Sequence, residues 1–366
     1  DCEKISQAPA PFHPTSRGWA GPSLLAMIVF EKFCQHQPLN RQAERYAREG
    51  VDLSLSTLAD QVGAVAELLK PLHDLIAAHV MAAERLHGDD TTVPLLARGG
   101  TKTARLWTYA RDERPWAGAA PPAAWYRFSG DRKGQHPKDH LARFHGWMHA
   151  DGYAGFEDLY RSGAIHEVAC MAHVRRKFVD IHRAQASPIA EEAIRRIARL
   201  YAVEKEARGL PPDKRVKLRQ ARAAPVFDDL ELWLAMQLTR ISGKSPLAAA
   251  IRYGLTRMVR MRPYLAHGIL ELDNNTAERG MRAIALGRKN YLFVGSEAGG
   301  NAAAIAYTLI ETAKLNAVDP HAWLADTLAR IPDYKITKVD DRGKLSLEPV
   351  LEEGEGADEA ETADAE

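Results

Sequence analysis

The sequence predicts an α/β protein with a mixed sheet as its core, an all-α insertion within that core and a helical N-terminal region. Three observations predict this fold class. Apolar residues recur at helical spacing through residues 22–85, and strand-like alternating runs begin at Leu86. A long helical stretch then separates those runs from the last helices. A chain of 366 residues is long enough for two or three such folding units.

The N-terminal part is predicted to hold a linker and then helices. Residues 1–21 are rich in proline and glycine and predict a linker with little structure. Within residues 22–85, the stretch 39–63 has the outline of a helix, a glycine-containing turn and a serine-capped helix that starts near Ser56. This outline suits a helix-turn-helix whose second helix enters the DNA major groove. Two packed helices joined by a turn are the commoner explanation of the same outline.

Residues 86–173 predict the first part of the sheet. Strand-like runs over 88–96, 102–112 and 123–131 follow one another, separated by glycine and proline. A short helix, a fourth strand ending at Asp151, another helix and a fifth strand over 166–173 come next. This order is that of a ribonuclease H-like sheet, in which the first and fourth strands are neighbours. The fold would therefore bring Asp89 and Asp151 together.

The second half of the chain is predicted to be mostly helical. Residues 174–265 predict the all-α insertion, which PPDK at 211–214 divides into at least two hairpins. Residues 266–331 predict the rest of the core, with a helix carrying Glu278, a strand-like run over 288–296 and closing helices. Residues 332–366 predict a connector and a disordered acidic tail.

The net charge of the whole chain is close to zero, although the part before the acidic tail is basic. The tail from 352 to 366 carries eight acidic and no basic residues, so removing it changes the net charge of +1 to +9. Clustered cations favour binding to a phosphate backbone, although solvated helix faces explain the same clusters. They lie at Arg175, Arg176 and Lys177, at Arg252, Arg257, Arg260 and Arg262, and at Arg288 and Lys289.

Other sequence features exclude several classes. No signal peptide is recognisable, and the apolar run at 24–30 is too short to span a bilayer, so no membrane partner is expected. Three cysteines give no disulfide framework and suit the cytoplasm. No Walker loop, dinucleotide fingerprint or Gly-x-Ser-x-Gly elbow occurs. The chain starts at Asp1 without methionine, and we expect a fragment or a processed product.

Three acidic residues carry the catalytic hypothesis. Asp89 and Asp151 each close a short apolar run, as a carboxylate at the end of a strand would, and Glu278 lies one turn into a helix. Such a set can hold two Mg²⁺ ions over a phosphodiester, with Asp151 bridging both. Structural alternatives exist for each residue: Asp151-Gly152 is a common turn pair, Asp89 and Asp90 could be polar strand ends, and Asn275-x-x-Glu278 has capping-box spacing.

Further polar residues are candidates for phosphate contacts. His173, at the end of the predicted fifth strand, could orient a phosphate or a water molecule. Arg279 and Arg282 lie on the helix of Glu278, where an i,i+4 pair between Glu278 and Arg282 is an equally good structural account. Cys170-x-x-His173 could bind zinc, but no second ligand pair lies near it in the sequence.

Long stretches of the chain, from about Pro9 to about Ile331, resemble transposases of the IS66 insertion-sequence family. The most specific are HQPLNRQAERYAREGVDLSLSTLADQVG, DRKGQHPKDHLARFHGWMHADGYAGF and LELDNNTAERGMRAIALGRKNYLFVGSEAGG. The resemblance implies a ribonuclease H-like DDE domain whose triad is Asp89, Asp151 and Glu278. It also implies two Mg²⁺ ions, or Mn²⁺ in their place, with cleavage at element ends and 3′-hydroxyl attack on target DNA. The candidate DNA contacts are His173, Arg279, Arg282, Arg288 and Lys289.

The resemblance also implies partners and departures. DNA ends and target DNA are the expected partners, in a homo-multimer that handles two ends, with accessory proteins of the same element as further candidates. Relatives carry a coiled coil and a zinc-binding module upstream, of which Cys2 resembles the last cysteine. Asp90 and Thr92 replace the family's usual Glu and Pro, and Met171 replaces a Trp.

The sequence therefore predicts a DNA transposase that lacks the N-terminal part of its relatives. Two other functions fit some of the same features. A catalytically silent remnant could bind element ends without cutting them. An unrelated metal-dependent nuclease would cleave DNA without joining it.

Overall fold

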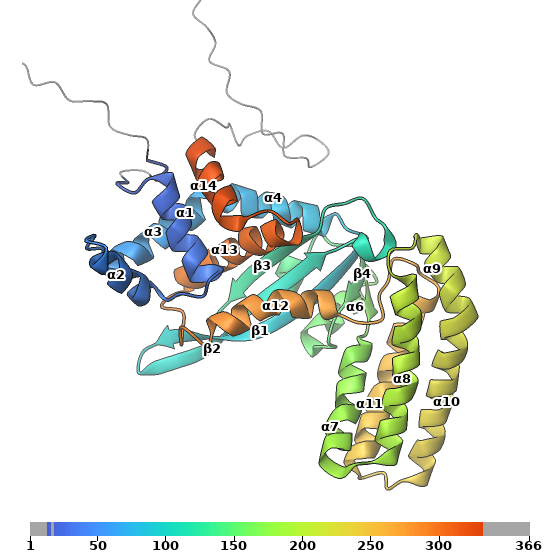
Figure 1. The fold of residues 1–366 in the computed structure, drawn as a ribbon. Helices are drawn as coiled ribbons and strands as arrows, with labels where there is room; N and C mark the ends of the chain where they lie inside the picture. The colour runs from blue at the N-terminus through green and yellow to red at the C-terminus, as the bar shows by residue number, and fades with distance from the viewer. Residues whose placement is uncertain (1–12, 16–17, 332–366) are drawn as a thin grey trace, which may run out of the picture.

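A five-stranded mixed sheet with the strand order β3-β2-β1-β4-β5 lies at the centre of the molecule (Figure 1). The computed structural model describes residues 13–15 and 18–331; the predicted acidic tail, Cys2 and most of the predicted linker lie outside them. The strands are β1 (Arg85–Ala97), β2 (Gly100–Arg111), β3 (Ala123–Ser129), β4 (Gly146–His149) and β5 (Ile165–Val168).

The first three strands form an antiparallel meander, and the last two run parallel to β1. A tight turn joins β1 to β2, and Gly99 occupies a left-handed conformation there (φ +78°) that favours glycine. On the other side, β1 pairs with β4 and β4 pairs with β5, both in parallel. The prediction that the first and fourth strands are neighbours is confirmed, which makes β1 the central strand.

Alternation along the strands gives the sheet two buried faces. Val93 and Leu95 of β1 contribute to one core, which also includes side chains from α12 (Asn275–Gly287) and α13 (Glu297–Leu315). Leu86 belongs to a second core on the opposite face, beside α5 (Gln135–His140) and α6 (Glu157–Arg161). Side chains two residues apart in β1 therefore share a face, and α12 lies on the face of Val93.

The helices predicted between residues 22 and 85 are present. They are α1 (Pro22–Phe33), α2 (Leu39–Arg48), α3 (Leu55–Leu68) and α4 (Lys70–Met81). The serine cap of α3 is Ser54, whose Oγ accepts from the Thr57 N–H at 3.1 Å, so this helix starts slightly earlier than predicted. α1 packs against α14 (Pro320–Arg330), and α3 packs against α13. These N-terminal helices therefore share a core with the C-terminal ones.

A four-helix bundle projects from one end of the sheet (Figure 1). It consists of α7 (Met171–Gln185), α8 (Pro188–Ala207), α10 (Ala224–Arg240) and α11 (Pro246–Met261), which share one apolar core. Pro211 precedes α9 (Pro212–Leu218), and this helix continues into α10 through a π-helical turn. The predicted helical character of this stretch is confirmed, while the domain boundaries at 86, 174 and 266 stay predictions.

Two predicted strand assignments are wrong. The fifth strand ends at Val168, and α7 begins at Met171, so His173 lies in the first turn of a helix. The apolar run from Val168 to Met171 is buried in both elements, so hydrophobicity alone did not mark the boundary. The run over 288–296 is no strand either, because it contributes a single bridge between Val294 and Leu95.

Among the described residues, no helix has the length and apolar character needed to cross a membrane.

Candidate active site

The pairing of β1 with β4 brings Asp89 and Asp151 to the same level of the sheet. His87 of β1 pairs with His149 of β4, and each aspartate lies two residues beyond its paired histidine. Asp89 is inside β1, which continues to Ala97, so the prediction that it ends a strand is wrong. The predicted end of the fourth strand at Asp151 is also wrong, because β4 ends at His149 and Asp151 lies in the loop after it. The central strand and the loop of its parallel neighbour therefore supply one carboxylate each.

Asp89 and its neighbour Asp90 point to opposite faces of the sheet and have different partners. Asp90 forms ion pairs with Arg105 at 3.0 Å and Arg132 at 2.7 Å, and its side chain is only 2% exposed. Asp89 lies on the face of α12 and accepts the Asp90 N–H at 2.8 Å. No ion pair joins Asp89 to another residue in the described part of the chain. Asp90 is therefore a structural carboxylate, whereas Asp89 is available to a ligand.

Asp151 has one oxygen in a turn and one directed towards a cation. Its Oδ1 accepts the Tyr153 N–H at 2.9 Å, and Gly152 has a φ of +82°. The Asp-Gly turn predicted as a structural role is therefore present. The other oxygen lies 3.9 Å from Nη2 of Arg132, the arginine that also binds Asp90. Arg132 thus connects the two aspartates, and no sequence pattern pointed to it.

Glu278 lies in the first turn of α12 but does not cap the helix. The cap residue is Asn274, whose side chain makes no capping hydrogen bond, and the Asn275 N–H donates instead to Oδ1 of Asp273 at 3.0 Å. The carboxylate of Glu278 lies 3.5 Å from Nη2 of Arg176 and 3.7 Å from Nδ1 of His173. Its Oε1 atom is buried and has no hydrogen-bond partner. The capping-box interpretation is wrong, and the alternative pair with Arg282 is not formed.

Asn274 fixes the start of α12 to the central strand. Its Nδ2 donates to the carbonyl of Gly88 at 2.9 Å, and its Oδ1 accepts the Nδ1–H of His87 at 2.9 Å. Its backbone N–H donates to Sγ of Cys170 at 3.1 Å. The Asn274 side chain is fully buried. Since Gly88 precedes Asp89, these bonds set the position of the Glu278 helix relative to Asp89.

We expect Asn274→Ala to cost about 2–4 kcal/mol in the free energy of unfolding, because it leaves a buried carbonyl and a buried imidazole N–H without partners. Asn275→Ala is the matched control, since the Asn275 side chain is half-buried and donates only to Asp273. Urea unfolding monitored by circular dichroism measures both variants. Equal costs for the two substitutions would contradict the anchoring role of Asn274.

The carboxylates interact electrostatically across the sheet. Burial raises the pKa of Asp89 to about 7, and the negative charges of Asp151, Asp90 and Glu278 add to the rise. Burial also lowers the pKa of His173, while the charge of Glu278 opposes this shift. A divalent cation would relieve the repulsion and give the unpartnered Oε1 of Glu278 a ligand. The residues therefore fit a hard metal ion that prefers oxygen donors.

Two buried histidines, His87 of β1 and His149 of β4, lie in the sheet next to the site. His87 and His149 stack with ring centroids 4.7 Å apart. Burial holds the pKa of both well below the ordinary value, and the charge of Arg85 lowers them further. Arg85 donates to Nε2 of His87, which leaves the proton on Nδ1 for its bond to Asn274. The pair is therefore neutral and holds β1, β4 and α12 together.

The predicted phosphate contacts fall into three groups. His173 faces Glu278, whereas Arg279, Arg282 and Lys289 are exposed along α12 and just after it. Arg288 is already engaged, because its Nη1 donates to the carbonyl and the hydroxyl of Thr92 at 2.6 and 2.7 Å. This contact attaches the end of α12 to β1.

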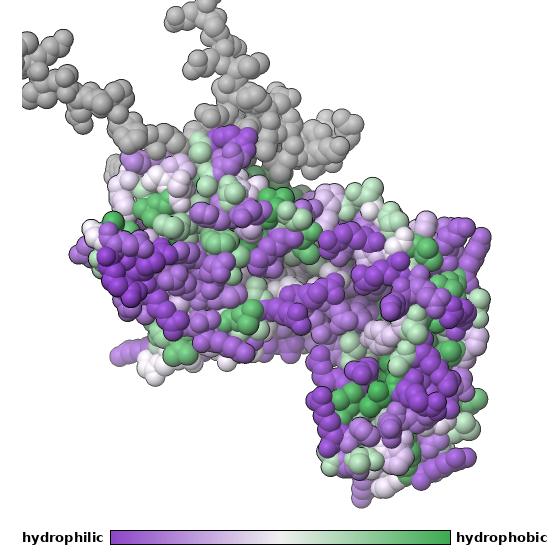
Figure 2. All heavy atoms as spheres, in the orientation of Figure 1, coloured by the Kyte–Doolittle hydropathy of each residue, from purple (hydrophilic) through white to green (hydrophobic). Residues whose placement is uncertain are grey.

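A basic groove of about 720 Å³ lies beside Glu278, where α12 meets the bundle. Three arginines of α7 line it, against two carboxylates, those of Asp180 and Glu278; the arginines are Arg175, Arg176 and Arg183. Figure 2 shows hydrophilic side chains over the end of α12 nearest the bundle. The sequence marked Arg175 and Arg176 as a cationic cluster, but only the fold puts them next to an acidic residue of the candidate triad.

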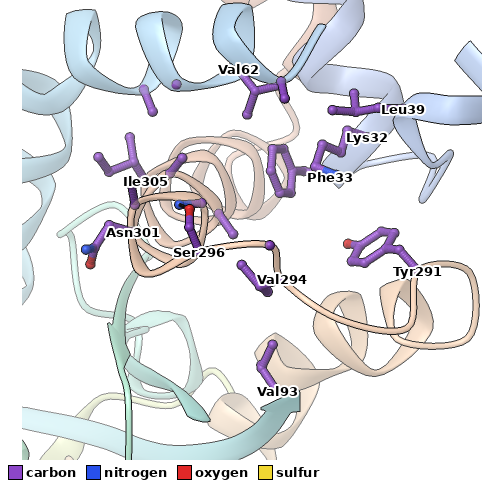
Figure 3. Close-up of a pocket in the computed structure, with 18 of the residues that line it drawn as sticks. Lys32, Phe33, Leu39, Val62, Val93, Tyr291, Val294, Ser296, Asn301 and Ile305 are labelled. Carbon is purple, nitrogen blue, oxygen red and sulfur yellow. Dashed lines mark hydrogen bonds between the residues drawn. The ribbon is translucent and has the colours of Figure 1, made fainter. Parts of the chain in front are cut away.

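A larger cavity of about 740 Å³ lies away from the carboxylates (Figure 3). Residues of α1, α3 and α13 make up more than half of its lining. Lys32 reaches its wall with Nζ 4.9 Å from the ring centre of Tyr291, and burial lowers the pKa of this lysine to about 8. None of Asp89, Asp151 or Glu278 lines this cavity.

Comparison with known proteins gives the family of the chain. Residues 17–302 match the transposase IS66 family domain, and residues 308–341 match the IS66 C-terminal element. The chain is 47% identical over 355 residues to the uncharacterized protein y4hP of Sinorhizobium fredii, covering 93% of this chain and 64% of that protein. It is 41% identical over 339 residues to the uncharacterized protein y4jD of the same organism, covering 90% and 66%.

The uncharacterized protein y4qI of Sinorhizobium fredii is 40% identical over 337 residues, covering 89% of this chain and 62% of that protein. The chain thus spans just under two thirds of the length of these relatives. The family domain alone matches most of the described residues. The chain belongs to the IS66 family of transposases.

Proposed function

We propose that this chain cleaves DNA at the ends of an insertion sequence and joins those ends to target DNA as a DDE transposase. The observation that carries the proposal is the pairing of β1 with β4, which brings Asp89 and Asp151 to one level of the sheet, together with the bond of Asn274 to Gly88 that holds the helix of Glu278 against β1. The negative charges of Asp151 and Glu278 both add to the raised pKa of Asp89, which supports placing the three carboxylates in one site. Three such carboxylates suit metal-dependent phosphoryl transfer.

The strand order supports a ribonuclease H-like catalytic core. Three meandering strands, a parallel fourth strand beside the first and a parallel fifth strand follow the arrangement predicted from the sequence. The helical bundle lies between β5 and α12 in the chain, so it interrupts this core before the helix that carries Glu278. An insertion at this point delivers Arg176 to the side of Glu278.

Asp89, Asp151 and Glu278 would hold two Mg²⁺ ions, or Mn²⁺ in their place. When bound, these ions would activate the attacking oxygen and stabilise the leaving oxygen of the phosphodiester. Other side chains position the carboxylates and the substrate. Arg132 holds Asp90 and the outer oxygen of Asp151 in place, while Asn274 holds α12 against β1. His173 presents a neutral ring beside Glu278, suited to orienting a phosphate or a water molecule.

The basic groove gives the DNA backbone a path to the carboxylates. Arg175, Arg176 and Arg183 line it, and the exposed Arg279, Arg282 and Lys289 extend the cationic surface along α12. Arginine forks match phosphate oxygens geometrically and through charge. Because two element ends must be handled together, a homo-multimer is part of the proposal, and accessory proteins of the element are candidate partners.

A strand-transfer assay tests the proposal. Pre-cut element-end DNA with a free 3′-hydroxyl is mixed with supercoiled plasmid and Mg²⁺, with a parallel reaction in EDTA. We expect joined product only in the presence of the metal. Cleavage without joining would instead favour a metal-dependent nuclease, and binding of end DNA without either reaction would favour a silent DNA-binding remnant. Product formation that survives EDTA would overturn the metal-dependent mechanism.

Mg²⁺ is expected to raise the melting temperature of the chain more at pH 8 than at pH 6. The raised pKa of Asp89, about 7, keeps this carboxyl protonated at pH 6, whereas the unfolded carboxyl titrates near 3.8. Its ionisation therefore destabilises the fold as pH rises through 7, and a bound cation offsets that cost only where the carboxylate is charged. Below pH 7, Mg²⁺ must displace the proton of Asp89. The apparent affinity for Mg²⁺ therefore falls by up to about tenfold for each pH unit.

Differential scanning fluorimetry with a Mg²⁺ titration measures this shift. Asp158→Asn is the control, since Asp158 is an exposed aspartate on α6 that pairs only with surface cations. It should respond to Mg²⁺ like the parent chain, while Asp89→Asn should lose the pH dependence of the response. A Mg²⁺ response that is the same at both pH values would contradict the role given to Asp89.

A further inference from the structure

Three potential ligands for a softer metal converge next to the candidate triad. Cys170 precedes the first turn of α7, His173 lies within that turn, and Glu278 lies in the first turn of α12. Their ligand atoms all lie within 4.8 Å of one another. The sequence offered only the Cys-x-x-His pair, which lacked further ligands nearby. The fold adds the third ligand from more than a hundred residues downstream.

The state of these atoms favours a bound cation. Nδ1 of His173 and Oε1 of Glu278 are buried, lie 3.7 Å apart and have no hydrogen-bond partner. Buried polar atoms without partners are costly, so two of them facing one another indicate a missing ligand. Burial lowers the pKa of His173, which keeps its ring neutral and able to coordinate.

The sulfur of Cys170 accepts a hydrogen bond that would stabilise it as a thiolate ligand. It accepts the backbone N–H of Asn274 at 3.1 Å, and such hydrogen bonds stabilise a thiolate. Burial raises the pKa of the thiol to about 12, so metal binding must displace its proton to solvent as the metal–sulfur bond forms. Without a metal ion the buried thiol stays protonated and unreactive. A metal ion is therefore the partner that would convert it to a thiolate ligand.

The donor set selects the class of metal. Sulfur and imidazole ligands favour Zn²⁺, Co²⁺ or Cd²⁺ over Mg²⁺, which prefers oxygen. We propose that Cys170, His173 and Glu278 bind Zn²⁺ or a metal of its class, and that this binding withdraws Glu278 from Asp89 and Asp151 and switches the reaction off. The metal site stands on the geometry alone, whereas its inhibitory effect rests on the proposed function.

Co²⁺ added to the full chain tests the metal site without any activity measurement. The parent for this experiment is the Cys2→Ser/Cys34→Ser variant, in which Cys170 is the remaining thiol of the three in the sequence. We expect a cobalt–thiolate charge-transfer band and tetrahedral visible absorption, both abolished by excess Zn²⁺. Adding Cys170→Ser should remove the band. No band in the parent, or a band that survives Cys170→Ser, would overturn the site.

His173→Ala provides a second variant because Cys170 is buried and its replacement could disturb folding. The His173 side chain is 23% exposed, and its removal should weaken Co²⁺ binding while the circular dichroism spectrum stays unchanged. Asp151→Asn should keep the cobalt spectrum, since Asp151 is no member of this cluster. Unchanged Co²⁺ affinity in His173→Ala would overturn the three-ligand site.

The inhibitory effect is tested separately, in the strand-transfer assay with excess Mg²⁺. Zn²⁺ should suppress joining by the parent, and each variant is compared with its own rate in the absence of zinc. For Cys170→Ser, the joining rate with zinc should equal its own rate without zinc. If the cobalt spectrum is present but zinc leaves joining unchanged, the inhibitory role fails and the metal site stands. If no joining occurs in any condition, the proposed function fails, and the cobalt result still decides the site.

Discussion

Asp151→Asn is expected to reduce strand transfer by about 10³-fold or more while the protein stays folded. Metal ligands contribute several kcal/mol to phosphoryl transfer, and each 1.4 kcal/mol corresponds to about tenfold in rate. Asparagine keeps the oxygen that accepts the Tyr153 N–H, so the turn at Gly152 is preserved. It removes the negative charge that a bridging ligand needs. The substitution therefore separates the turn role of Asp151 from its catalytic role.

Single-turnover joining of pre-cut ends measures the loss, and thermal melting without metal measures folding. Asp158→Asn is the matched control, because it makes the same chemical change at an exposed position seven residues away. That variant should join DNA at the parent rate. Asp151→Asn should also lower the pKa of Asp89, since the charge of Asp151 is one cause of its elevation. Normal joining by Asp151→Asn would show that its carboxylate only shapes the turn.

The strand order followed from the sequence because it depends on local patterns. Alternating apolar runs over 88–96, 102–112 and 123–131 each fit one strand, and the pairing of β1 with β4 followed from their order. The same reasoning brought Asp89 and Asp151 together. It misplaced Asp89 at the end of a strand, since β1 continues past it as half of a long hairpin with β2.

The details of the site depend on contacts that no local pattern encodes. The bond between His87 and Asn274 joins residues 187 positions apart, and the contact of Arg176 with Glu278 spans 102. Asn274 fits a helix cap by its type and position, yet its side chain bonds to the central strand. Capping preferences describe the isolated helix, whereas here the sheet offers a buried carbonyl to which the Asn274 side chain donates.

His173 illustrates the same limit. Its position in the first turn of α7, and not at the end of a strand, depends on where β5 stops, and the apolar residues there suit both elements. Placing it on the helix turns its ring towards Glu278 and makes the cluster with Cys170. The sequence supplied the correct residue types for this part of the site, but only the fold brings the first turns of α7 and α12 close enough for these side chains to meet.

Glu278→Gln should produce a loss of strand transfer as large as that of Asp151→Asn, about 10³-fold, with almost no change in stability. Under the capping-box interpretation glutamine would cap the helix as well as glutamate and activity would survive. In the structure Glu278 caps nothing, and its nearest cation is Arg176, whose side chain is 58% exposed. A pair that exposed contributes at most about 1 kcal/mol, so its loss hardly affects folding.

Glu297→Gln is the control for Glu278→Gln. Glu297 also lies in the first turn of a helix, α13, and pairs with an exposed lysine, Lys102, but it is not one of the three candidate metal ligands. Both variants should melt near the parent temperature without metal, and only Glu278→Gln should lose joining and most of the Mg²⁺ response. If Glu278→Gln joins DNA like the control, the third carboxylate is no metal ligand, and the function proposed for the convergence of β1, β4 and α12 fails with it.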